Sequence, residues 1–344
     1  MHHFSAEQSY HGMENNSPQA PLVSLVIPMF NEFVVLDMLF DAVRKATADL
    51  TERIEIILVD DGSSDGTREA LADKVKGFDC WQILYLSRNF GQQSAYRAGL
   101  HAARGDAVIF LEADLQDPPS LIPDLLSRWH AGFRVVTACR TSRKERGMRR
   151  WAFDLFHVLF HRLTKGMMPR DSGMYALVDR TVANHLISAP EVDIFLPALK
   201  CWYGYAQTVI YYAREERAAG KPKQSFLRLL NYALNGIFSF SELPLQSIAI
   251  LGVMVSIVGF GYALILMVIK LGQLAGLFLT WEVRGFTTLA VAVFCLGGVQ
   301  LTCLGIIGQY VARIYRELKN RPHFIVEKIV TSNESGRIHQ TSRN

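Results

Sequence analysis

Charged residues are scarce in this 344-residue chain: they make up 20% of it, against 50% hydrophobic residues. The scarcity is concentrated in two stretches, 243–269 and 285–312, which contain no Asp, Glu, Lys or Arg. Disorder requires high charge and low hydrophobicity, and uncharged apolar runs of this length belong in a bilayer, so a disordered chain and a purely soluble one are both excluded. The 36 basic and 32 acidic residues nearly cancel, which gives no indication of a nucleic-acid partner.

Cysteine is rare as well, and the first residues lack a secretion signal. The five cysteines are scattered and never form a Cys-x-x-Cys pair, so the sequence predicts neither a disulfide framework nor a zinc knuckle and fits a reducing, cytosolic setting. Residues 1–20 contain no apolar run of the kind that a secretory signal needs. We therefore expect a flexible lead-in there.

From Pro21 to about residue 224, short apolar runs alternate with segments of helical length. The runs are Val23–Ile27, Ile54–Val59, Ile83–Leu86, Ala107–Leu111 and Arg134–Ala138, and the helical segments are 34–50, 66–76, 92–103 and 120–131. This alternation is typical of a parallel sheet with crossover helices. We therefore predict that residues 21–224 form an α/β domain with a Rossmann-like, mostly parallel sheet.

Polar clusters follow the first four predicted strands. They are Asn31-Glu32, residues 60–66, residues 88–91 and residues 112–119. In open α/β sheets, ligands bind at the carboxyl ends of the strands. The clusters therefore mark the predicted site.

The cluster after the fourth strand carries the most chemical information. Glu112, Asp114 and Gln116 supply hard oxygen ligands at alternate positions. Such ligands suit Mg²⁺ or Mn²⁺ and leave coordination positions for a diphosphate, where a divalent ion would neutralise the charge on a leaving nucleotide. The alternative is a solvated acidic turn that Pro118-Pro119 closes.

Asp60 and Asp61 lie side by side at the end of the second predicted strand. Adjacent carboxylates repel each other, and we interpret the pair as acceptors of hydrogen bonds from a base and a ribose. As an alternative, both are ordinary turn residues, and Asp65 caps the next helix.

The two uncharged stretches are 27 and 28 residues long, whereas about 20 residues suffice to cross a bilayer. Basic residues flank the pair on its outer sides, so the positive-inside rule places the α/β domain and the C-terminus in the cytoplasm. The predicted segments are an interfacial amphipathic helix over 225–242, transmembrane helices over 243–269 and 285–312, a non-cytoplasmic connector over 270–284 and a cytosolic basic tail over 313–344.

The polar clusters, taken in order, resemble those of a known family. Val26–Glu32, Val59–Thr67, Arg88–Gly91 and Ala113–Pro119 are similar to the motifs of the inverting family 2 glycosyltransferases of GT-A fold. More narrowly, the chain resembles the polyprenyl-phosphate glycosyltransferases, which include dolichyl-phosphate mannose synthases and bacterial bactoprenol glucosyltransferases. The similarity covers about residues 22–326 and includes the two-helix membrane hairpin.

This resemblance implies a sugar nucleotide and a divalent ion at the strand ends. The residues expected around the nucleotide are Pro28, Asn31, Glu32, Asp60, Asp61 and Ala113. By the same match, Glu112, Asp114 and Gln116 hold Mg²⁺ or Mn²⁺, and Asp114 is expected to be catalytic. The family usually has Asp where this chain has Glu112, which adds a methylene group to the ligand.

The resemblance also assigns a reacting centre and a lipid-phosphate site. Asp171 matches an Asp-x-Gly segment beside the reacting centre and is expected to be catalytic, although residues 174–176 depart from the usual Asp-Phe-Arg. The alternative for Asp171 is a turn acid after Pro169. Arg217 and Lys223 match a basic loop that would meet a lipid phosphate at headgroup depth. Charge that only follows the positive-inside rule is the alternative for these two residues.

We therefore expect a multi-pass enzyme of the inner (cytoplasmic) membrane that transfers a sugar, by default from UDP-glucose, to undecaprenyl phosphate with inversion. Expected partners are the donor, the lipid acceptor, membrane lipids and further copies of the chain, with no nucleic acid. One open alternative is a processive polysaccharide synthase, but its Gln-x-x-Arg-Trp motif is absent because Leu125 precedes Arg128-Trp129. The other is a non-catalytic scaffold that binds nucleotide, which Glu112 and residues 174–176 favour.

Overall fold

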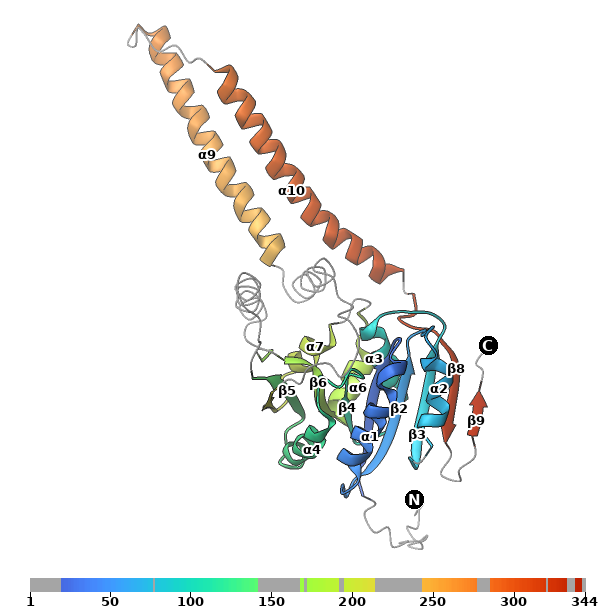
Figure 1. Ribbon diagram of the computed structural model, residues 1–344. Coiled ribbons are helices and arrows are strands. Elements are labelled where there is room, and N and C mark those ends of the chain that lie inside the picture. The colour runs from blue at the N-terminus through green and yellow to red at the C-terminus, as the bar shows by residue number, and fades with distance from the viewer. Residues whose placement is uncertain are drawn as a thin grey trace, which may run out of the picture.

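The chain forms an α/β domain and two long helices that extend away from it (Figure 1). The computed structural model describes residues 20–76, 78–141, 168–169, 172–191, 195–213, 243–276, 285–319, 321–332 and 338–341. The predicted amphipathic helix over 225–242 lies outside these residues, as do nearly all of the predicted lead-in and much of the predicted connector.

The strands of the described residues form one mixed sheet in the order β7-β5-β6-β4-β1-β2-β3-β8-β9. Their bounds are β1 Leu22–Met29, β2 Arg53–Asp60, β3 Cys80–Leu86, β4 Ala107–Phe110, β5 Val135–Arg140, β6 Ser172–Asp179, β7 Gln207–Tyr212, β8 Val326–Ser332 and β9 Ile338–Thr341. The central strands β4, β1, β2 and β3 are parallel neighbours. The predicted mostly parallel α/β sheet is therefore confirmed, and each of the five predicted strands overlaps an observed one.

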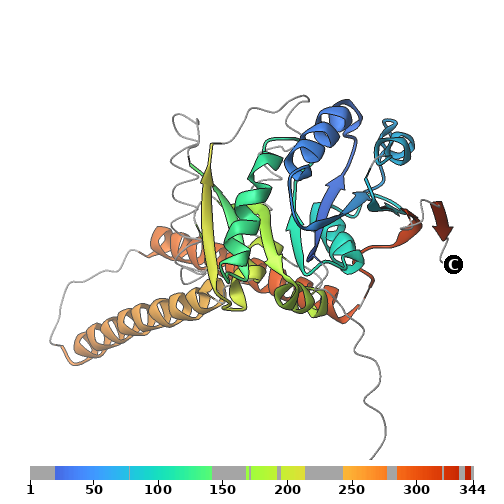
Figure 2. The same cartoon turned by 90° about the horizontal axis from the view of Figure 1, so that it is seen from below.

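Helices cover both faces of the sheet (Figure 2). The helices are α1 Leu36–Thr47, α2 Thr67–Lys74, α3 Gln92–Ala102, α4 Ile122–His130, α6 Arg180–Ser188 and α7 Leu196–Trp202, with 3₁₀ turns η1 Phe33–Val35 and η2 Pro119–Leu121. One hydrophobic core packs under α1, α2 and α4, and the other packs under α3, α6 and α7. Because both faces are covered, β1 and β4 are apolar and buried along nearly their whole length.

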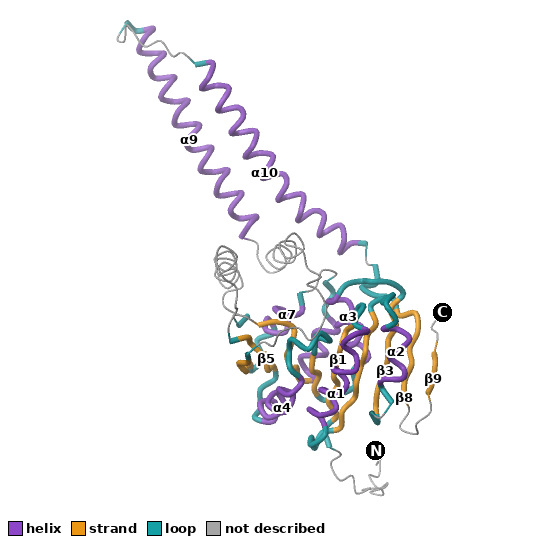
Figure 3. The backbone as a smooth tube through the Cα atoms, in the orientation of Figure 1, coloured by secondary structure: helices purple, strands orange, loops and turns teal. Residues whose placement is uncertain are grey.

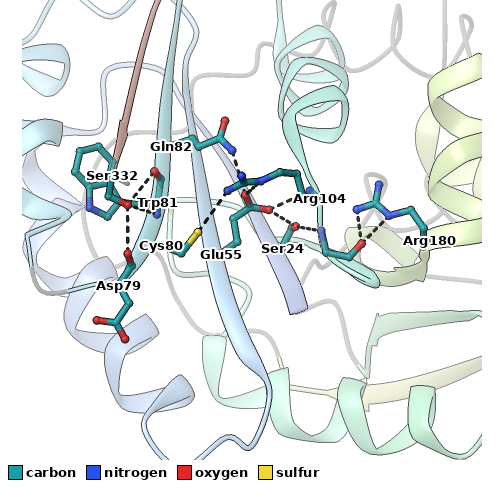
Figure 4. A network of polar contacts seen from close by, with 10 residues as sticks. Ser24, Glu55, Asp79, Cys80, Trp81, Gln82, Arg104, Arg180 and Ser332 are labelled. Carbon is teal, nitrogen blue, oxygen red and sulfur yellow. Dashed lines mark hydrogen bonds and ion pairs between the residues drawn. The ribbon is translucent and has the colours of Figure 1, made fainter. Parts of the chain in front are cut away.

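The amino ends of the parallel strands are fixed by a buried carboxylate. Glu55 of β2 is fully buried and accepts hydrogen bonds from Ser24 Oγ at 2.7 Å and from Gln82 Nε2 at 3.1 Å (Figure 4). Arg104 donates to the same carboxylate from its backbone N at 3.0 Å and from Nε at 2.9 Å. This network ties β1, β2, β3 and the loop before β4 together at the end of the sheet remote from the polar clusters.

The segment after the second long helix supplies the last two strands at one side of the sheet, β8 and the edge strand β9. β8 pairs antiparallel with β3, with Leu86 opposite Val326, and β9 pairs with β8. The pairing places the carboxyl end of β3 next to the start of β8, a few residues after the second long helix ends. Residues 313–344 were expected to form only a cytosolic basic tail, and neither of these strands was predicted.

The two long helices, α9 (Leu243–Leu274) and α10 (Phe286–Leu318), extend from the domain as a pair (Figure 3). Within them, Leu245–Ile269 and Cys295–Leu318 are long and apolar enough to cross a membrane. Their apolar side chains are exposed: Phe260 keeps 78% and Leu301 71% of its surface accessible. Water does not favour so large an apolar surface, whereas lipid tails do.

Candidate functional site

The carboxyl ends of β1, β2, β3 and β4 bring the four predicted polar clusters to one edge of the sheet. The register joins the strands there: the backbone N of Asp61 donates to the Met29 carbonyl at 2.9 Å, and that of Leu111 donates to the Val26 carbonyl at 3.0 Å. Pro28, in β1, pairs with Val59 of β2 and lies within the buried strand. The predicted meeting of the clusters therefore follows from the observed register.

The loops after β1 and β2 are bound directly to each other. The backbone N of Asn31 donates to Ser63 Oγ at 2.9 Å, and Asn31 Oδ1 accepts from the backbone N of Ser64 at 2.8 Å. The backbone N of Glu32 donates to Thr67 Oγ1 at 2.9 Å. Asn31 has a φ of 55°, a left-handed conformation that Asn tolerates better than most residues. Asn31 therefore shapes the rim of the site through the loop that it holds.

Asp60 and Asp61 are both buried and hold different loops. Asp61 accepts from the backbone N of Phe90 at 2.7 Å and of Gly91 at 2.9 Å, so it fixes the loop after β3. Asp60 Oδ1 accepts from the backbone N of Ser63 at 3.2 Å and fixes the loop after β2. Burial raises the pKa of both carboxyl groups. The two adjacent acids position the walls of the site.

Gly62 permits the close approach of these two loops. A Cβ atom at this position would lie 2.7 Å from the Arg88 carbonyl carbon, and the residue has a φ of +75°. Next to it, the exposed Arg88 places its guanidinium 4.0 Å from the centre of the Phe90 ring. The loop after β3 therefore adds a cation to the rim of the site.

A tight turn follows β4 and carries the predicted metal ligands. Leu115 has a φ of 58°, and the backbone N of Gln116 donates to Asp114 Oδ1 at 3.1 Å. Glu112 precedes the turn and accepts from Gln92 Nε2 at 3.2 Å, while Ala113 is buried beneath it. The turn thus brings Glu112, Asp114 and Gln116 into one short segment at the centre of the sheet edge.

Asp117 anchors this turn to the neighbouring strands. Its fully buried carboxylate accepts from Arg140 Nη2 at 3.3 Å and from the Tyr212 hydroxyl, and Arg140 Nε donates to that hydroxyl at 3.2 Å. Burial and the charge of Asp117 raise the pKa of Tyr212, so the phenol stays protonated. Tyr175 of β6 donates to the Pro118 carbonyl at 2.9 Å. The turn over residues 112–117, called the acid turn below, is therefore held by residues of β5, β6 and β7.

The turn carries more negative charge than its neighbours balance. Burial, followed by the charges of Asp117 and Asp114, raises the pKa of Glu112 to about 7. Asp117 Oδ2 has no hydrogen-bond partner among the described residues. An environment that disfavours carboxylate charge in this way is one that a cation would relieve.

The donor set fits a magnesium-like ion that is shared with a substrate. No group of three or more His, Cys, Asp or Glu side chains converges closely enough to hold a metal ion in the part of the chain that the structure describes. A self-contained protein cage is therefore not present in that part. Mg²⁺, however, is usually held by one or two carboxylates together with substrate phosphates and water, and Glu112 and Asp114 with Gln116 satisfy that requirement.

The described residues do not include every predicted site residue. Asp171, Arg217 and Lys223 lie outside them, so their assignments stay predictions. Sequence reasoning gave no role to Arg140, Tyr175 and Tyr212, which support the acid turn, and included Asp117 only as part of the motif Ala113–Pro119. Arg140 ends β5, which overlaps the predicted strand Arg134–Ala138, so a search of all predicted strand ends would have found it, whereas Tyr212 ends β7, a strand that was not predicted.

Comparison with known proteins gives consistent matches. The family model described as glycosyl transferase family 2 matches residues 24–187. An uncharacterized glycosyltransferase of Synechocystis is 41% identical over 310 residues, which are 89% of this chain and 95% of that protein. A prophage-derived bactoprenol glucosyl transferase of Shigella flexneri is 36% identical over 310 residues, which are 89% of this chain and 97% of that protein. An undecaprenyl-phosphate 4-deoxy-4-formamido-L-arabinose transferase of Pseudomonas paraeruginosa is 35% identical over 311 residues, covering 90% of each.

Proposed function

Because the chain belongs to glycosyltransferase family 2, we propose that it transfers a sugar from a nucleotide diphosphate to a polyprenyl phosphate. The observation that carries the proposal is the acid turn 112–117 at the carboxyl end of β4, in a chain that also has two apolar helices. Relatives named for bactoprenol and undecaprenyl phosphate support a lipid acceptor. Those two relatives are named for different sugars, and UDP-glucose is the default donor to test first.

The reaction needs positioning more than it needs a base. A phosphate oxygen of the acceptor is anionic at neutral pH, attacks the anomeric carbon from the face opposite the leaving group, and displaces the nucleoside diphosphate with inversion. Glu112, Asp114 and Gln116 would hold Mg²⁺ or Mn²⁺, and the bound ion would supply positive charge to the leaving diphosphate. Asp61 and Asn31 keep the loops around the nucleotide in place through the hydrogen bonds described above.

The remaining contacts are proposed from family resemblance and from charge. Asp171 would orient the acceptor at the reacting centre, and Arg217 and Lys223 would bind its phosphate at headgroup depth. Pro28, Glu32 and the other strand-end residues would surround the nucleotide. A homo-oligomer is part of the same proposal.

The route of the chain supports a membrane hairpin with both ends on one side. The α/β domain precedes α9, and β8 follows α10 and pairs with β3 of the same domain. Both flanks of the helix pair must therefore lie on the side of the domain. The basic residues of those flanks favour the cytoplasmic face of the inner membrane.

A transfer assay tests this function directly. Labelled UDP- and GDP-sugars are incubated with undecaprenyl phosphate and the full chain in detergent, with Mg²⁺ or Mn²⁺ and with EDTA as the control. We expect one donor to yield a labelled, mild-acid-labile lipid that EDTA abolishes. A folded chain that binds nucleotide but labels no lipid from any donor would contradict the proposal and favour a scaffold.

A further inference from the structure

The strand β8, which follows α10, belongs to the same sheet as the loops after β1 and β2. These two loops, which contain Asn31 and Ser63, are called the donor loops below because they are predicted to line the nucleotide site. The backbone N of Ser87 donates to the Ile325 carbonyl at 3.0 Å, and the backbone N of Trp81 donates to Ser332 Oγ at 2.9 Å. Phe324 packs against the second core and lies edge-on to His101 of α3, with ring centres 5.7 Å apart. The segment 324–332 is therefore bound to the catalytic domain at both ends.

An acid of β8, Glu327, contacts α2, the helix that follows the loop after β2. Glu327 forms an ion pair with Arg68 of α2. The same guanidinium lies 5.0 Å from the centre of the Tyr85 ring, and the Tyr85 hydroxyl donates to the Arg68 carbonyl at 3.2 Å. The first two contacts fix the direction of the Arg68 side chain, and the third holds its backbone.

Arg68 is directed at a buried carboxylate of the donor loop. Its Nε lies 3.8 Å from Asp60 Oδ2, and the Asp60 side chain is fully buried. Among the described residues that oxygen accepts no hydrogen bond, and the Arg68 guanidinium places positive charge beside it, in addition to the hydrogen bond that Ser63 donates to the other oxygen. A buried carboxylate that loses its cation is strongly disfavoured.

The other oxygen of Asp60 connects this ion pair to the donor loops. Asp60 Oδ1 accepts from the backbone N of Ser63, and Ser63 Oγ accepts from the backbone N of Asn31. A displacement of Asp60 would therefore move both loops that line the predicted nucleotide site. The contact series runs from Glu327 through Arg68 to Asp60 and Ser63.

We propose that Arg68 is a positioning residue of the donor site, and that the C-terminal strand β8 holds it there through Glu327. The inference rests on the proposed function and adds to it a part of the chain far from the acid turn. Donor binding then depends on a strand that lies beyond the membrane helices. Arg68 contacts Asp60 and is not required to touch the substrate.

The test compares Arg68→Met with a matched control, Arg44→Met, in the full chain. Arg44 also pairs with an acid on the surface, Asp41 at 3.3 Å, and also lies over a ring, that of Phe78 at 5.3 Å, but it has no contact with Asp60. For Arg68→Met we expect the donor KM to rise about tenfold, with little change in kcat or in the KM for polyprenyl phosphate. Arg44→Met should change none of these.

Glu327→Gln should raise the donor KM about threefold, because the exposed ion pair between Glu327 and Arg68 contributes less than the buried ion pair between Arg68 and Asp60. Its matched control is Asp41→Asn, which removes the acid partner of Arg44 and should have no effect. The double variant Arg68→Met/Glu327→Gln should have the donor KM of Arg68→Met alone, because Glu327 acts on the donor site only through its ion pair with Arg68.

The outcomes separate this inference from the proposed function. A wild-type chain that transfers sugar while folded Arg68→Met keeps the wild-type donor KM would overturn the inference alone. A donor KM of the Arg68→Met/Glu327→Gln variant well above that of Arg68→Met would overturn the role of β8, because Glu327 would then act without Arg68. A wild-type chain that neither transfers sugar nor binds UDP would overturn the proposed function, and the inference with it.

Discussion

Buried carboxylates at the two ends of the parallel strands differ in how completely they are hydrogen-bonded. At the amino ends, Glu55 receives four hydrogen bonds, two of them from Arg104. At the carboxyl ends, Asp60 and Asp117 are as deeply buried, yet each keeps one oxygen without a hydrogen bond among the described residues. Both ends are built from loops that connect strands to helices.

The difference separates an acid whose two oxygens are both hydrogen-bonded from acids that also depend on ion pairs, with Arg68 and Arg140. Buried polar atoms in proteins are nearly always hydrogen-bonded, so an unsatisfied one calls for an explanation. At the amino ends no further charge can be accommodated, because every acceptor position of Glu55 that the structure shows is in use. At the carboxyl ends, negative charge is left over where a cation and a diphosphate are expected. Mutations at each end should therefore affect different quantities.

The largest effect is expected at the acid turn. Asp114→Asn should lower kcat by about a thousandfold or more, because the leaving group would lose its electrostatic support, while the melting temperature stays near that of the wild type. Asp124→Asn, an exposed acid on α4, is the control and should leave both unchanged. The measurement is sugar transfer with thermal unfolding of the same preparation. Retention of most of the activity would contradict the metal assignment.

At the amino ends of the strands, a substitution is expected to lower stability and to leave donor binding unchanged. Glu55→Ala should destabilise the domain by about 3 kcal/mol, because it leaves Ser24, Gln82 and Arg104 without their shared acceptor, and the fraction that remains folded should keep the wild-type donor KM. Glu69→Ala, on exposed α2 surface, is the control. Thermal and urea unfolding would check the stability. If Glu55→Ala lost turnover without losing stability, the contrast between the two ends would be wrong.

Substitution of Asp117 should have an effect between those of Asp114→Asn and Glu55→Ala. Its Oδ1 accepts hydrogen bonds, as the Glu55 oxygens do, whereas its Oδ2 accepts none among the described residues. Asp117→Asn keeps an acceptor for Tyr212 but removes the charge opposite Arg140, so the acid turn should shift and kcat should fall about tenfold. Tyr212→Phe removes only the hydroxyl and should have a smaller effect. Steady-state kinetics at saturating donor would distinguish them. Equal losses in the two variants would show that the hydroxyl, and not the charge, holds the turn.

The smallest effect is a pH dependence of the metal-free protein. The pKa of Glu112 is raised from 4.5 to about 7, so its protonated form stabilises the fold at low pH, and that contribution is lost as the pH rises through this window. In EDTA the melting temperature should therefore decline between those two pH values. Glu112→Gln should flatten the decline, and Glu69→Gln should not. Added Mn²⁺ should stabilise the wild type more at the upper end of the window, because metal binding favours the ionised carboxylate.

Local sequence patterns were sufficient to predict the central sheet. The run Ile54–Val59 lies within β2, and the helix expected over 92–103 is α3, because apolar periodicity and helical length are local properties. The strands β6, β7 and β8 were not predicted, since their partners lie far away in sequence. The segment Val326–Ser332 is rich in β-branched residues and could have indicated a strand.

The meeting of the site motifs could be predicted from the sequence, whereas the contacts between them could not. The four clusters meet as expected, because parallel strands end at one edge. The sequence could not show that Asp60 and Asp61 hold loops, since that depends on which backbone N–H groups the fold brings to them. Nor could it show that Asp117, Arg140 and Tyr212 converge, because their strands become neighbours only through the register of β5 and β7.

The pairing of β8 with β3 has a consequence for the order in which the chain is made. Trp81 and Ser332, which are joined by a hydrogen bond, are 251 residues apart in sequence. During synthesis, β3 remains an open edge until both apolar helices have left the ribosome. The last strand of the domain thus arrives after the anchor, and the sheet can be completed only once the chain has passed the stage at which its helices are delivered to the membrane.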